Sequence, residues 1–87
     1  MKGRSKFWGE FQYISAKQIE LALSINAYRR LHNMNQTEFA HICNLYGEQH
    51  GVKFAQTEIS AYELMKQAPR KAKFQVLCNV LNLKNKN

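Results

Sequence analysis

Polar and small side chains gather near the middle of the chain, in a short run that holds Gln56, Thr57, Ser60 and Ala61. The amide of Gln56 both donates and accepts hydrogen bonds, as the N7 and N6 atoms of adenine require in the major groove of DNA. Thr57 and Ser60 add hydroxyls and a methyl group beside it. The run therefore predicts contacts with base edges. The alternative is that Gln56 and Thr57 only open a soluble helix.

A helix must hold these side chains at fixed positions. The segment that begins at Gln56 has helical spacing, with Ile59, Tyr62 and Leu64 expected on its buried side. Its opposite face is polar and carries the four side chains named above. We predict that this helix presents them to DNA.

Another helix is predicted to begin at Gln36. Asn35 and Glu38 have the spacing of a capping box, in which each side chain accepts a hydrogen bond from the other residue's backbone N–H. The apolar stripe of this helix consists of Phe39, Ala40 and Cys43. The helical pattern fades around Leu45 to Gly47, and Gly47 and Gly51 bracket a loop.

Two further helices complete the predicted fold. No Gly or Pro interrupts the chain from Ser15 to about Asn33, where the apolar positions are Leu21, Ile25 and Tyr28. Pro69 suits the first turn of a last helix. The apolar positions of that helix are Phe74, Leu77, Cys78 and Leu81. We predict an all-α fold, a compact bundle of four to five helices, over residues 15–83.

Two short segments flank this bundle. Residues 84–87 form a polar tail, and residues 1–14 form a basic and aromatic N-terminal arm. The cations of the arm are Lys2, Arg4 and Lys6, which would follow the DNA backbone or enter the minor groove unless the arm is an ordinary flexible terminus. Its aromatic residues are Phe7, Trp8, Phe11 and Tyr13. They either extend the core or dock a partner.

Net charge favours a polyanionic partner. The chain carries a formal charge of +7 and has a pI near 9.7, although excess Lys also serves solubility alone. The predicted contacts with backbone phosphates are Lys53, Lys66, Arg70, Lys71 and Lys73. Three of these stand at the start of the last helix, where cations oppose the helix dipole and so favour an external anion. A solvated charged face is the alternative.

Three segments resemble a known family: Arg29, the run Asn-Gln-Thr-Glu-Phe-Ala at residues 35–40, and the run Gln-Thr-Glu-Ile-Ser-Ala-Tyr-Glu at residues 56–63. Together they resemble the lambda-repressor/Cro class of helix-turn-helix domains, over about residues 18–83. The long link between the second and third helices is most similar to that of the POU-specific domain of eukaryotic transcription factors. The resemblance implies a lambda-repressor-like bundle whose third helix lies in the major groove.

The same resemblance implies individual roles. Gln36 would lie beside Gln56 and touch a phosphate, Thr57 would contact phosphate or base, and Arg29 would form a buried ion pair with Glu63. Three departures separate the chain from the POU-specific pattern. Ala61 stands where that family has Arg to read guanine, Ala55 replaces the usual Ser cap, and the link at residues 48–53 is longer. The family's base preference therefore does not transfer.

Other chemistry finds little support in the sequence. A zinc site from His32, His41, His50 and Cys43 lacks close ligand pairs on one face. No phosphate-binding loop, nucleophile motif or paired carboxylates indicate an enzyme, so we expect neither catalysis nor a cofactor.

Cys43 and Cys78 are predicted core residues. The absence of a long apolar run predicts an intracellular protein without a membrane span, nuclear in a eukaryote and cytoplasmic in a prokaryote or phage.

The sequence thus predicts a transcriptional regulator that binds double-stranded DNA. It would act as a homodimer or beside a second DNA-binding domain in a longer chain. The alternative is a protein-interaction module that uses the same fold without base-specific binding. An RNA-binding use of the basic face ranks lower, because the third helix lacks aromatic residues for base stacking.

Overall fold

The computed structural model describes residues 15–83, and this part of the chain is built from helices without any strand. Its elements are α2 (Ala16–Leu31), α3 (Gln36–Gly47), the short 3₁₀ helix η1 (Glu48–His50), α4 (Gln56–Glu63) and α5 (Lys71–Leu81). The predicted all-α class and the predicted starts at Gln36 and Gln56 are confirmed. The predicted N-terminal arm and polar tail lie outside the described residues.

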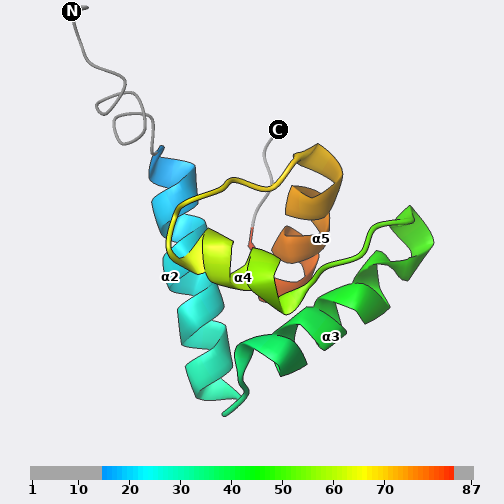
Figure 1. Ribbon diagram of the computed structural model, residues 1–87, viewed down its shortest axis with the longest axis horizontal. Coiled ribbons are helices and arrows are strands. Elements are labelled where there is room, and N and C mark those ends of the chain that lie inside the picture. The colour runs from blue at the N-terminus through cyan, green and yellow to red at the C-terminus, as the bar shows by residue number, and fades with distance from the viewer. Residues whose placement is uncertain (1–14, 84–87) are drawn as a thin grey trace, which may run out of the picture.

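The short helix α4 occupies the centre of the arrangement (Figure 1). It packs against both α2 and α3, while α5 packs against α3 and also touches α2. None of the helices within residues 15–83 has the length and hydropathy needed to cross a membrane. The helices surround one core, so the exposed face of α4 is fixed by contacts on its opposite side.

The core draws on every α-helix and on the link before α4. Its buried members are Leu21, Ile25, Phe39, Ala40, Cys43, Phe54, Ile59, Tyr62, Val76, Leu77 and Val80. Burial of a large apolar side chain stabilises a fold by roughly 1.5–3 kcal/mol. The core includes both predicted inward residues at the centre of α4, Ile59 and Tyr62. Cys43 and Cys78 are buried free thiols, as expected of core residues.

Side-chain caps set where α2 and α3 begin. The predicted capping box of α3 is present, with Asn35 N donating to Glu38 Oε1 and Glu38 N donating to Asn35 Oδ1, each at 2.8 Å. A second box, not predicted from the sequence, joins Ser15 and Gln18 at the start of α2. Each box satisfies backbone N–H groups that the first turn of a helix leaves without partners.

Two expectations about helix ends are wrong. α5 begins at Lys71 and not at Pro69, because residues 67–70 form the non-helical connection that leads from α4 to α5. Leu64 is 59% exposed, although it was expected on the buried side of α4. α4 ends at Glu63, and Met65 then adopts a left-handed φ of 60°, so the apolar stripe stops before Leu64.

Candidate nucleic-acid interface

An ion pair joins α2 to α4 beneath the exposed face of α4. Arg29 Nε donates to Glu63 Oε2 at 2.8 Å, and Arg29 Nη2 donates to Glu63 Oε1 at 3.0 Å. The two side chains are 19% and 11% exposed. Arg29 Nη1 also donates to the carbonyl of Met34 at 3.2 Å. The hydrogen bond to Glu63 raises the pKa of Arg29, so the guanidinium stays charged in this setting.

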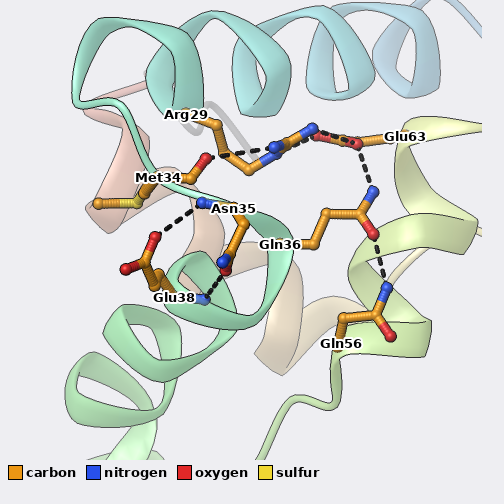
Figure 2. Close-up of polar contacts among 7 residues, drawn as sticks. All are labelled: Arg29, Met34, Asn35, Gln36, Glu38, Gln56 and Glu63. Atoms are coloured by element: carbon orange, nitrogen blue, oxygen red, sulfur yellow. Dashed lines mark hydrogen bonds and ion pairs between the residues drawn. The ribbon is translucent and has the colours of Figure 1, made fainter.

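Two glutamine side chains extend this pair to the surface (Figure 2). Gln36 Nε2, at the start of α3, donates to Glu63 Oε1 at 2.7 Å. Gln56 Nε2, at the start of α4, donates to Gln36 Oε1 at 2.6 Å. A continuous chain of hydrogen bonds therefore runs from Arg29 through Glu63 and Gln36 to Gln56. We call it the amide chain.

The chemistry of the amide chain fixes the orientation of both glutamine amides. An ionised carboxylate only accepts hydrogen bonds, so Gln36 must turn its NH₂ group toward Glu63 and its oxygen toward Gln56. Gln56 must then turn its own NH₂ group toward Gln36. One N–H and the oxygen Oε1 of Gln56 remain unused, and Oε1 points away from Gln36 in Figure 2. Gln56 is exposed and offers both groups to a ligand.

Glu58 and Lys73 fix the start of α4 from the side of α5. Ala55 has no side-chain acceptor, and its N–H donates to Glu58 Oε1 at 3.1 Å. Lys73 Nζ donates to Glu58 Oε2 at 2.5 Å and lies 5.3 Å from the ring centroid of Phe54. Lys73, predicted as a phosphate contact, thus has an internal partner and attaches α5 to α4.

Asn44 holds the link before α4 and was missed by the sequence analysis. Its Oδ1 accepts from Phe54 N at 2.6 Å, and its Nδ2 donates to the Phe54 carbonyl at 3.1 Å. Both backbone groups of Phe54 are thereby satisfied two residues before Gln56. A signal was available in the sequence, because Asn is disfavoured inside a helix unless its side chain has a specific partner.

The remaining predicted base contacts share α4 with Gln56. Thr57 is exposed, while Ser60 and Ala61 are half-buried on the same helix. The predicted phosphate contacts other than Lys73 and Gln36 are Lys53, Lys66, Arg70 and Lys71, all exposed and none in an ion pair formed within residues 15–83. Lys2, Arg4 and Lys6 lie outside the described residues.

Basic residues outnumber acidic residues in the described part of the chain. Residues 15–83 contain eight Lys and Arg against five Glu, which leaves +3 of the total +7. Three of those Glu, at positions 38, 58 and 63, already bind groups within the fold. The surface therefore presents basic side chains with few acidic neighbours.

The start of α5 lacks features that α2, α3 and α4 have. Ser15 Oγ and Asn35 Oδ1 accept hydrogen bonds from first-turn N–H groups of α2 and α3, and α4 carries Glu58 in its first turn, which accepts from the N–H of Ala55. α5 has no side-chain cap and no acidic residue in its first turn. Arg70 and Lys71 stand there instead, next to unsatisfied N–H groups that favour an anion.

Comparison with known proteins gives no relative for this chain: no family model, no curated protein and no solved structure matches it. Within residues 15–83 no three His, Cys, Asp or Glu side chains come close enough to hold a metal ion. The amide chain and the basic surface are the features of the described residues that bear on function.

Proposed function

We propose that this chain binds double-stranded DNA sequence-specifically as a transcriptional regulator, with α3 and α4 as a helix-turn-helix and α4 in the major groove. One observation carries the proposal: the amide of Gln56 is exposed at the start of α4, yet its orientation is fixed by the amide chain. The free oxygen and N–H of Gln56 match the donor N6 and acceptor N7 of adenine. The residues that hold it, Gln36 and Glu63, are half-buried.

The other candidate side chains fall into two groups, those that would contact bases and those that would contact backbone phosphates. Thr57, Ser60 and Ala61 lie on the same helix as Gln56 and would face neighbouring bases, with the methyl groups of Thr57 and Ala61 suited to thymine. Gln36 would touch a phosphate at the start of α3. Further phosphate contacts would come from Lys53, Lys66, Arg70 and Lys71, which position the protein without specifying sequence.

The length of α4 argues for a second DNA-reading unit. Eight residues of α-helix span about 12 Å, enough for a few base pairs. A longer site would require a second copy on a two-fold sequence or another DNA-binding domain in the same polypeptide. The proposal involves no catalysis or cofactor, and it places the protein in the nucleus of a eukaryote or the cytoplasm of a prokaryote or phage.

The test is selection from a pool of random duplexes with the wild type and with Gln56→Ala. We expect the wild type to enrich a motif that contains adenine, Gln56→Ala to lose that adenine, and affinity to fall steeply with salt. Thermal unfolding of both proteins shows that the variant is folded. If the wild type enriches no motif and binds weakly at low salt, sequence-specific DNA binding is refuted.

A protein-interaction module is the second candidate, and one observation favours it. α2 exposes Ile19, Leu23 and Leu31 by 44%, 66% and 79%. Their spacing places them along one ridge of the helix, where exposed apolar side chains are typical of contact surfaces. Leu23→Glu would abolish a protein contact made through this ridge and leave the duplex selection unchanged.

A further inference from the structure

We propose that methylation of the adenine N6 blocks the contact made by Gln56, so that DNA binding by this protein is switched off by N6-methyladenine. The inference rests on the proposed function and concerns the regulation of the same site. Its basis is the fixed orientation of the Gln56 amide, which the amide chain imposes from Arg29 outward.

The base presents two groups to a side chain in the major groove. Adenine N7 accepts a hydrogen bond, and the N6 amino group donates one hydrogen while its other hydrogen pairs with thymine. A methyl group on N6 replaces the hydrogen that faces the groove when the base pair is kept. Gln56 Oε1 would then meet a methyl group in place of a donor.

An unrestrained glutamine would escape this contact by rotating its side chain. Gln56 is restrained, because its Nε2 lies 2.6 Å from Gln36 Oε1. Turning the Gln56 amide over would set its oxygen against the oxygen of Gln36, which places two acceptors together. Swinging it away would break the bond to Gln36 and leave that oxygen without its partner.

Gln36 is restrained as well. Its Nε2 donates at 2.7 Å to Glu63, and Glu63 accepts two hydrogen bonds from Arg29. Arginine only donates and a carboxylate only accepts, so no rearrangement of protons reverses the direction of the amide chain. The extra methyl group therefore costs the hydrogen bond between Gln56 and Gln36, a movement of the DNA, or the contact with the base.

The experiment uses the tightest duplex from the random-pool selection, with each adenine in turn replaced by N6-methyladenine. We expect methylation at one position to weaken binding of the wild type about 10-fold or more, and methylation elsewhere to change it less than about 3-fold. 7-Deazaadenine at the same position, which removes the N7 acceptor, should also weaken binding. These arms need only the wild-type protein, so they do not depend on the folding of any variant.

Two variants test the role of the amide chain. In Gln56→Ala the ratio of affinities for unmethylated and methylated duplex should approach 1 at the sensitive position. In Gln36→Ala the ratio should fall below the wild-type value, since a released Gln56 is able to swing aside. An unchanged ratio in Gln36→Ala would overturn the restraint as the cause of the sensitivity.

The outcomes separate this inference from the function on which it rests. If the wild type binds methylated and unmethylated duplexes equally while Gln56→Ala still loses the adenine preference, the methylation switch is wrong and DNA recognition stands. If the wild type shows no adenine preference in the selection, both proposals are overturned.

Discussion

Arg29 on α2 and Glu63 on α4 form two hydrogen bonds, of 2.8 and 3.0 Å, across 34 residues of sequence. The guanidinium and the carboxylate are both planar, so paired bonds fix direction as well as distance. This pair sets the orientation of α4 against α2. It is also the inner end of the amide chain that reaches the surface at Gln56.

Removal of Glu63 should destabilise the whole domain. Glu63→Ala leaves Nε and Nη2 of the mostly buried Arg29 and Nε2 of Gln36 without their acceptors, and we expect the free energy of unfolding to fall by about 3 kcal/mol. Urea denaturation at neutral pH measures this change. Glu20→Ala, an exposed acid on α2, is the matched control and should cost less than about 0.5 kcal/mol. A loss under 1 kcal/mol in Glu63→Ala would contradict the structural role.

Lys71 and Lys73 should behave differently although they are two residues apart. Lys71 is exposed, so Lys71→Ala should lower the magnitude of the salt slope of DNA binding by about 0.9 and leave thermal stability unchanged. Lys73 has Glu58 and Phe54 as partners, so Lys73→Ala should cost about 1 kcal/mol of stability with little effect on the slope. Plots of affinity against salt, together with melting curves, give both quantities. Equal slopes for both variants would argue against this division.

Asn44 should control the order of the link before α4. Asn44→Ala removes the partners of both backbone groups of Phe54, and we expect a loss of about 2 kcal/mol together with faster hydrogen exchange at the Phe54 N–H. Asn79, exposed on α5, supplies the control variant Asn79→Ala. An unchanged exchange rate at Phe54 in Asn44→Ala would show that the Asn44 side chain does not hold the link.

The sequence predicted the helices well because their local signals agreed with their burial. The capping box at Asn35 and the apolar stripes of α2 and α3 each specify a helix that the tertiary fold preserves. The start of α5 was predicted too early. Proline is accepted both in the first turn of a helix and in a non-helical connection, and only the path of the chain after α4 shows that Pro69 lies in the connection. The predicted burial of Leu64 was wrong for a similar reason, because periodicity does not show where a short helix ends.

The candidate site was predicted in part, through residue types and through resemblance. Gln56 could be singled out from its chemistry, and the resemblance implied its neighbour Gln36 and the pair of Arg29 with Glu63. Asn44 and Glu58 were missed, since their partners lie on the link and on α5 and only the folded chain brings them together. The same long-range contact gave Lys73 an internal role that its charge alone did not predict.

Alkaline pH should destabilise the fold through two core groups. Burial raises the pKa of Cys43 from 9.0 to about 12, and burial together with Glu58 raises the pKa of Tyr62 from 10.0 to about 12. Both groups are neutral when protonated, so the unfolded chain releases these protons first as pH rises. Stability is therefore complete below about pH 9 and falls between pH 9 and 12, by up to about 1.4 kcal/mol per pH unit for each group.

Denaturation in urea at pH 8, 9.5 and 10.5 measures this effect. Tyr62→Phe removes one titrating group and keeps the ring, so its stability should fall less steeply above pH 10. An identical pH profile for Tyr62→Phe and the wild type would show that Tyr62 does not contribute.

Because α4 is short, its exposed face depends on the rest of the fold for its structure. Helices shorter than about 12 residues are marginal in water, and α4 has eight, so a peptide copying residues 56–63 would be largely unstructured. Its shape is maintained by Arg29 from α2, Asn44 from α3 and Lys73 from α5. Grafting the exposed face of α4 onto another protein would therefore require all three of these residues as well. In the native chain, α4 should unfold in the same thermal transition as the contacts that these residues make.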